Sequence, residues 1–263
     1  MALYDRLFGG FNLTVAQVLL THDDLRSRPR HLSARLTLLE LLARGVIPII
    51  NENDTVAVDE IKFGDNDRLG ALTATLVDAE LLVILSHVEG LLDHEGKLVP
   101  AVAQITRDIE ALAGGTDRTT SVGGMKSKIE AAKIVTRAGL PMIIASGERA
   151  NVLPDLLEGR DIGTIFLPHA GKLASRKRWI AFFQRPAGAI VVDAGARQAL
   201  CADGKSLLAK GVVAAEDDFA AGDLVSIRDQ DQVEFARGLA KISRKELGPA
   251  SGVVVHRDDL VIL

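Results

Sequence analysis

The sequence is poor in cysteine, in long apolar runs and in excess charge of either sign. Its 263 residues contain one cysteine, Cys201, so an internal disulfide is excluded and a reducing compartment is expected. No uninterrupted apolar run approaches the roughly 20 residues that a membrane helix requires, and residues 1–6 do not resemble the start of a signal peptide. The net charge of −4 argues against a protein that binds nucleic acid or membrane over its whole surface. We therefore expect a cytoplasmic protein without a membrane partner.

Two common phosphate-binding motifs and a metal-ligand pattern are also absent. Neither G-x-G-x-x-G nor G-x-x-x-x-G-K-[ST] occurs, which removes the usual glycine-rich signatures of dinucleotide and nucleotide sites. The histidines show no metal-ligand spacing, so no metal site built from side chains is predicted. Apolar residues, in contrast, make up 48% of the chain, which is enough for a sizeable core, and the length of 263 residues suits one large domain or two ordinary ones.

Residues 1–183 alternate between helical and strand-like patterns. Such alternation is typical of a mostly parallel sheet covered by helices, so we expect one α/β domain over this range. The helices are expected over 3–8, 31–43, 67–77, 124–138 and 151–157, and the strands over 15–20, 46–50, 79–85, 140–145 and 164–167.

The pattern changes after a linker-like stretch at residues 184–188. Residues 184–263 contain short strand-like segments separated by glycines and acidic turns, which predicts a small, partly closed β-barrel as a second domain. The strands are expected over 189–192, 211–214, 224–227, 233–238 and 252–256.

Two acidic-amide segments carry the first functional signal. Asn51-Glu52-Asn53-Asp54 directly follows the expected strand 46–50, and Gly64-Asp65-Asn66-Asp67 precedes an expected helix. Ligands of open α/β sheets bind beyond the carboxyl ends of the strands, where Asp and Asn can hold an ammonium group or a carboxylate. The same residue types are also the usual turn and helix-capping residues, so a purely structural role stays open.

A third segment, Gly123-Gly124-Met125-Lys126-Ser127-Lys128, leads into a helix. Glycines let backbone N–H groups approach an anion, the helix N-terminus adds positive partial charge, and Lys128 adds a full charge. Phosphoryl transfer needs such positioning and charge neutralisation. The alternative is a glycine turn before an ordinary helix with solvated lysines.

Five segments in order resemble the glutamate 5-kinases. They are residues 48–54, 64–67 and 123–128, together with Arg176-Lys177-Arg178-Trp179-Ile180 and Val255-His256-Arg257-Asp258-Asp259. The resemblance implies an amino-acid-kinase fold, with a mostly parallel sheet between helices, followed by a small β-barrel PUA domain. It implies ATP-dependent phosphorylation of the γ-carboxylate of L-glutamate with Mg²⁺, which is the first step of proline biosynthesis.

The resemblance also implies roles for individual residues. Asp54 and Asn66 correspond to glutamate-binding residues, supported by Asn51, Asp65 and Asp67, and Lys128 corresponds to the catalytic, phosphate-contacting lysine. The residues corresponding to the ATP-binding positions are Ser86, His87, Val122, Gly123, Gly124, Met125, Lys126, Ser127 and Lys128. The chain departs from the family at two of these, because His87 stands where the family has Asp and Val122 where it often has Thr.

The family has an opening section that does not appear before Met1. It carries a first strand and a glycine-rich phosphate loop, so we expect this polypeptide to be an inactive or weakly active, N-terminally truncated kinase. The alternatives are a pseudo-kinase or RNA-binding regulator that keeps the PUA domain, and a related kinase for acetylglutamate or aspartate, which the C-terminal β domain disfavours. The family further implies feedback inhibition by proline and a homo-oligomer. The acidic turns of the β domain give RNA binding little support.

Overall fold

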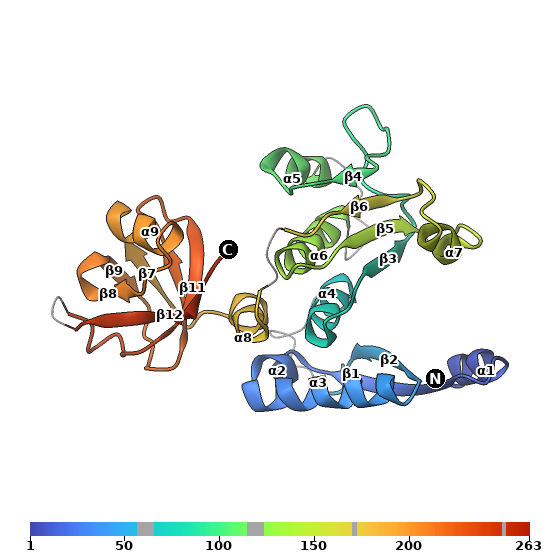
Figure 1. The fold of residues 1–263 in the computed structure, drawn as a ribbon, viewed down its shortest axis with the longest axis horizontal. Coiled ribbons are helices and arrows are strands. Elements are labelled where there is room, and N and C mark those ends of the chain that lie inside the picture. The colour runs from blue at the N-terminus through green and yellow to red at the C-terminus, as the bar shows by residue number, and fades with distance from the viewer. Residues whose placement is uncertain (57–65, 115–123, 170–172, 249–250) are drawn as a thin grey trace. The chain divides into compact units, whose positions relative to one another are not determined.

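The computed structural model describes residues 1–56, 66–114, 124–169, 173–248 and 251–263 (Figure 1). The chain divides into two compact units, Met1–Lys172 and Leu173–Leu263. The first unit contains α/β structure and the second is mainly β. Within the described residues, no helix combines the length and apolarity needed to cross a membrane.

The first unit begins with a helix and a pair of parallel strands. Helix α1 (Ala2–Gly9) leads into β1 (Thr14–Leu20), which pairs with β2 (Val46–Glu52) from Thr14 opposite Val46 to Leu20 opposite Glu52. Both strands are rich in Val, Ile and Leu, which suit a pleated surface packed against helices. Their carboxyl ends therefore lie side by side.

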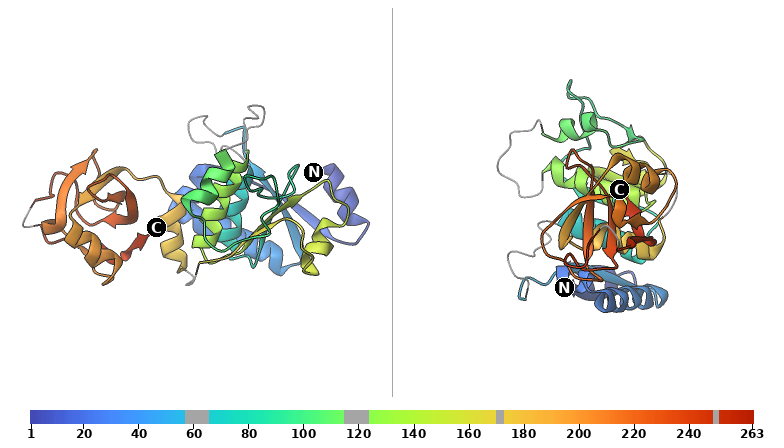
Figure 2. Two further views of the ribbon diagram at one scale, coloured as in Figure 1. Left: turned by 90° about the horizontal axis from the view of Figure 1, so that it is seen from above. Right: turned by 90° about the vertical axis from the view of Figure 1, so that its left-hand side faces the viewer.

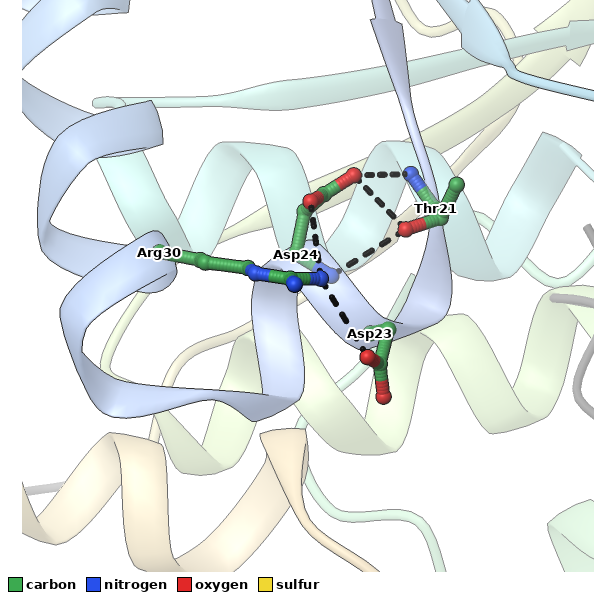
Figure 3. A network of polar contacts seen from close by, with 4 residues as sticks. All are labelled: Thr21, Asp23, Asp24 and Arg30. Atoms are coloured by element: carbon green, nitrogen blue, oxygen red, sulfur yellow. Dashed lines mark hydrogen bonds and ion pairs between the residues drawn. The ribbon is translucent and has the colours of Figure 1, made fainter. Parts of the chain in front are cut away.

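A capping box fixes the turn that follows β1 (Figure 3). The Asp24 backbone N–H donates to the Thr21 hydroxyl, while the Asp24 carboxylate accepts from the Thr21 backbone N–H at 2.9 Å. These bonds start the short helix α2 (His22–Arg26) and satisfy N–H groups that have no partner within the helix. Arg30 of α3 (Arg28–Ala43) adds an exposed ion pair to Asp23. Helix α3 ends before Gly45, whose φ of +71° suits a glycine.

The other strands of this unit form a separate four-stranded sheet. Their order is β3 (Leu82–Ser86), β5 (Met142–Ser146), β6 (Thr164–Phe166) and β4 (Ala101–Val102). Strand β3 is parallel to β5 and β4 is parallel to β6, whereas β5 and β6 are antiparallel. The expected mostly parallel α/β architecture is confirmed. Among the described strands it is built as two sheets, with β2 and β3 each at an edge.

Helices α4 (Asn66–Val77) and α6 (Met125–Arg137) pack against each other (Figure 1). Helix α4 also contacts both β2 and β3, so it spans the two sheets. Its buried face holds Leu69, Leu72 and Leu76. Helix α5 (Arg107–Gly114) packs on α6, and α7 (Val152–Leu157) follows β5. The N-terminal turns of α4 and α6 thereby become neighbours, although the sequence separates them.

The second unit contains a curled six-stranded sheet, and helix α9 (Ala194–Cys201) follows its strand β7 (Gly188–Val192) (Figure 2). Its core contains Ile190, Val225 and Val255, all fully buried. The strand order is β8 (Leu207–Leu208), β12 (Val253–Ile262), β11 (Glu234–Ala240), β10 (Leu224–Arg228), β7 and β9 (Val212–Glu216).

The segment before β7 packs with the second unit. Helix α8 (Ser175–Arg178) continues into a buried π-helix, Trp179–Phe183, and both contact β12. Arg237 of β11 donates to the Ala181 carbonyl oxygen at 2.8 Å. The division between the units therefore precedes α8, whereas the sequence pattern placed the domain boundary between residues 183 and 184.

A partly buried ion pair gives the second unit a testable pH dependence. Burial alone would raise the pKa of Glu234, but the two hydrogen bonds and the positive charge of Arg237 outweigh it and hold the pKa of this carboxyl below its ordinary value of 4.5. The carboxylate therefore contributes its full stability above pH 4.5, and this contribution is lost as the pH falls through the lowered pKa. Glu234→Gln is expected to cost about 1–2 kcal/mol at pH 7, and much less near pH 3.

Thermal unfolding at the two pH values measures this difference. Glu216→Gln is the matched control, because Glu216 forms a more exposed ion pair with Arg228. The Arg228 side chain is 35% exposed and the Glu216 side chain 45%. Such an exposed pair contributes about 0.5 kcal/mol or less. An equal cost of Glu234→Gln at both pH values would contradict the assigned role of the carboxylate.

Candidate functional site

The first turns of α4 and α6 meet in a three-residue cluster. One carboxylate oxygen of Asp67, Oδ2, accepts from the Lys128 ammonium at 2.9 Å and from the Ser127 hydroxyl at 2.7 Å. Asp67 belongs to the second acidic-amide segment and Lys128 to the glycine-lysine segment. The structure therefore joins two of the three segments that the sequence singled out.

The pair of Asp67 and Lys128 is largely withdrawn from solvent, with side chains 15% and 8% exposed. Removing two charges from water is costly, and their attraction offsets this cost only when the geometry is good. A buried ion pair is thus weak evidence of a stabilising role. Its position at the N-termini of two helices instead suits a lysine that must be held in place for an anionic ligand.

The N-terminus of α6 has the properties of an anion site. Gly124 is its N-cap residue and supplies no side-chain cap, and the first turn contains no acidic residue. The first N–H groups of a helix have no acceptor within the helix and carry positive partial charge. Lys126 is exposed and Lys128 is buried in the same turn. Together these donors can hold an anionic group.

The first acidic-amide segment lies at the carboxyl end of β2. Asn51 is opposite Leu19 in the sheet, and the Asn53 backbone N–H donates to the Leu20 carbonyl oxygen at 2.9 Å. The side chains of Asn51 and Asp54 are exposed. In the described part of the chain, the hydrogen bonds of the Asp67 cluster do not extend to them. Asn66, the first residue of α4, is also exposed.

Ser86 and His87 lie at the carboxyl end of β3. Ser86 is opposite Ser146 of β5, and its carbonyl oxygen accepts from the Gly147 backbone N–H at 2.7 Å. His87 is exposed. The remaining candidates, Asp65, Val122 and Gly123, lie outside the described residues, so their predicted roles stay predictions.

The ion pair between Asp67 and Lys128 was not predicted from the sequence. The motif assigned Asp67 to the glutamate site, but its carboxylate contacts the lysine predicted to act on phosphate. A signal existed, because both residues stand in the first turn of a helix within one α/β domain. Adjacency of those two helices depends on the order of the strands, which the sequence pattern does not supply.

Two family models match the chain. The model of the amino acid kinase family matches residues 1–146, and that of the PUA domain matches residues 188–257. Among curated proteins, the glutamate 5-kinase of Moorella thermoacetica is 47% identical, with all of this chain and 75% of the relative aligned. The glutamate 5-kinase of Pelobacter propionicus is 45% identical over all of this chain and 76% of its own length.

Similarity to solved structures is weaker. A carbamate kinase from Giardia has a TM-score of 0.38 and 23% identity, over 52% of this chain and 45% of its own. A UMP kinase from Ureaplasma parvum has a TM-score of 0.40 and 13% identity, over 62% of this chain and 63% of its own. Similarities at this level carry no argument about function.

Proposed function

Because the chain belongs to the amino acid kinase family and, within it, to the glutamate 5-kinases, we propose that it transfers the γ-phosphoryl group of ATP to the γ-carboxylate of L-glutamate. The products are γ-glutamyl phosphate and ADP. We place this reaction in the cytoplasm as the first step of proline biosynthesis, in a homo-oligomer inhibited by proline.

The observation that carries the proposal is the contact between Asp67 and Lys128. It connects the segment assigned to glutamate with the segment assigned to ATP. An ammonium group has three N–H donors and can bind a phosphate oxygen while it keeps the bond to Asp67. We infer that Lys128 supplies positive charge between the two substrates.

The chemical step needs little from the protein beyond position and charge. The γ-carboxylate is ionised near pH 7, so its oxygen attacks the γ-phosphorus without a general base. The bond from that phosphorus to the bridging oxygen breaks, and its electron pair stays on ADP. Lys128 and the N-terminus of α6 would stabilise the charge on the transferring oxygens. Mg²⁺ bound to the ATP phosphates supplies further charge neutralisation.

The competing functions have less support. The relatives from Moorella thermoacetica and Pelobacter propionicus, which match the whole chain, are glutamate 5-kinases, and this does not favour a pseudo-kinase or an RNA-binding regulator. A kinase for acetylglutamate or aspartate would share the α/β unit, and the PUA match at residues 188–257 does not point to it. The acceptor is therefore the property to test.

The test traps the acyl phosphate as its hydroxamate, with Mg-ATP and one acceptor at a time. We expect product with L-glutamate and at most about a hundredth as much with N-acetylglutamate or L-aspartate, because a site that pairs the substrate's polar groups discriminates by this margin. Reactions without ATP give the background. Equal product with another acceptor would refute the proposed acceptor. No product from folded protein would mean that this polypeptide is inactive, which is the other outcome expected from its sequence.

A further inference from the structure

A short hairpin follows the loop that carries Ser86 and His87. Its base is formed by Leu91 and Val99, where the Val99 backbone N–H donates to the Leu91 carbonyl oxygen at 2.8 Å. Leu92 and Leu98 form the next bridge. At the tip, the Asp93 carboxylate accepts from the backbone N–H groups of Glu95 and Lys97. The hairpin is therefore closed and ordered at both ends.

One hydrogen bond at the base of this hairpin is replaced by a side chain. The Leu91 N–H and the Val99 carbonyl do not bind each other, because the hydroxyl of Thr164 stands between them. Thr164 Oγ1 accepts from the Leu91 N–H at 2.8 Å and donates to the Val99 carbonyl oxygen at 2.7 Å. Thr164, the first residue of β6, is completely buried. A buried hydroxyl that both donates and accepts a hydrogen bond holds its two partners in a fixed arrangement.

The surroundings leave room for this link only because two neighbours are glycines. A Cβ atom on Gly90 would lie 2.5 Å from Thr164 Oγ1 and 2.7 Å from Leu98 Cδ1. A Cβ atom on Gly163 would collide with the Ile144 carbonyl oxygen of β5, and its φ of +78° also favours glycine. Residues 163 and 164 are thus tightly packed between β5 and the loop after β3.

The other end of that loop is also anchored. The Gly147 backbone N–H donates to the Ser86 carbonyl oxygen at 2.7 Å, so residues 86–91 are tied to β5 at one end and to β6 at the other. Between the anchors, the side chains of His87 and Glu89 are exposed. A loop held in this way presents its exposed groups in a fixed arrangement, which lowers the ordering cost of binding a ligand.

We propose that Thr164 is a positioning residue for the nucleotide, which acts by fixing residues 86–91 and the base of the following hairpin. The inference rests on the proposed function, because it takes Ser86 and His87 as nucleotide contacts. Because Thr164 is completely buried, we expect it to touch neither substrate. Its hydroxyl is expected to affect the affinity for Mg-ATP and to leave glutamate binding and the chemical step almost unchanged.

The test compares Thr164→Val, which keeps the shape and removes the hydroxyl, with Thr164→Ser, which keeps the hydroxyl. For Thr164→Val we expect the KM for Mg-ATP to rise about tenfold, while kcat and the KM for glutamate change by about twofold or less. Thr164→Ser is expected to retain the parent KM for Mg-ATP within about threefold. Amide exchange of Leu91 should accelerate in the Val variant without any ligand.

Thr75→Val is the matched control, because the buried Thr75 hydroxyl donates to the Ala71 carbonyl oxygen within α4. Thr75→Val should lower the melting temperature without a selective change in the KM for Mg-ATP. An unchanged KM for Mg-ATP in Thr164→Val, or equal losses for both substrates, would overturn the inference.

Direct binding of Mg-ATP separates this inference from the proposed reaction. Suppose that the parent chain binds Mg-ATP and that Thr164→Val weakens this binding, while glutamate is not phosphorylated. In that case glutamate is not the acceptor, and the positioning role of Thr164 is supported. If the parent chain binds no Mg-ATP, both proposals fail.

Discussion

Replacing Lys128 with methionine is expected to lower kcat for glutamate phosphorylation about 10²- to 10³-fold. Methionine keeps an unbranched apolar stem that is one atom shorter than lysine, but it removes the charge that would face the transferring phosphoryl group. Loss of one preorganised donor to developing charge has an effect of about this size. The KM for glutamate should change by about twofold or less, since the charge acts mainly in the transition state. Steady-state kinetics of hydroxamate formation measure both constants.

Lys133→Met provides the control on the same helix. Lys133 forms ion pairs with Glu110 and Glu130, so its loss also removes a paired lysine from α6, but the residue has no assigned part in the site. Its kcat should stay within about twofold of the parent value, with at most about 1 kcal/mol of lost stability. Similar losses of kcat in the two variants would contradict a specific catalytic role for Lys128.

Replacing Asp67 with asparagine is expected to lower kcat about 10²-fold and to destabilise the first unit by about 2–4 kcal/mol. The amide can still accept hydrogen bonds from Ser127 and Lys128, but it removes the negative charge beside the buried Lys128 ammonium. Thermal unfolding and kinetics of the purified variant test the two effects separately.

The double variant Asp67→Asn, Lys128→Met distinguishes catalysis from stability. It removes both buried charges, so most of the stability lost in Asp67→Asn should return, while kcat should be no higher than in Lys128→Met alone. This non-additive pattern is expected of residues that act as one unit. Recovery of activity together with stability would mean that the pair serves only the fold.

The sequence predicted the elements with strong periodic patterns. Residues 46–50 and 124–138 were expected as a strand and a helix, and the structure has β2 at Val46–Glu52 and α6 at Met125–Arg137. A short run rich in β-branched residues and an apolar helical stripe explain this success, because each favours a local structure without help from distant residues.

Elements decided by tertiary contacts were missed or shortened. The last strand was expected to end at residue 256, yet β12 continues through the charged residues Arg257, Asp258 and Asp259 to Ile262. Pairing with β11, in which Leu260 lies opposite Gly238, overrides the turn-like composition there. Helix α9 was also missed, although the Asp193 carboxylate that accepts from the Ala196 backbone N–H is a recognisable N-cap.

The motifs in the sequence predicted which residues belong to the candidate site, but not which of them contact each other. The segments that contain Asp67 and Lys128 were identified from residue types and their order. The contact between the two residues spans 61 positions and depends on how α4 packs beside α6. The hydroxyl of Thr164 gives no signal in the sequence, since its partners lie 73 and 65 positions away.

Transfer of an isotopic label tests the central claim most directly. L-Glutamate labelled with ¹⁸O in its γ-carboxylate is incubated with the chain, Mg-ATP and hydroxylamine, and the mass of the released phosphate is measured. If the γ-carboxylate attacks ATP, hydroxylamine then displaces a phosphate that carries one oxygen from glutamate, and Lys128→Met should strongly reduce this labelled phosphate. Phosphate without the label, at the same rate in the parent chain and in Lys128→Met, would show that glutamate is not the acceptor and that Lys128 does not serve the transfer.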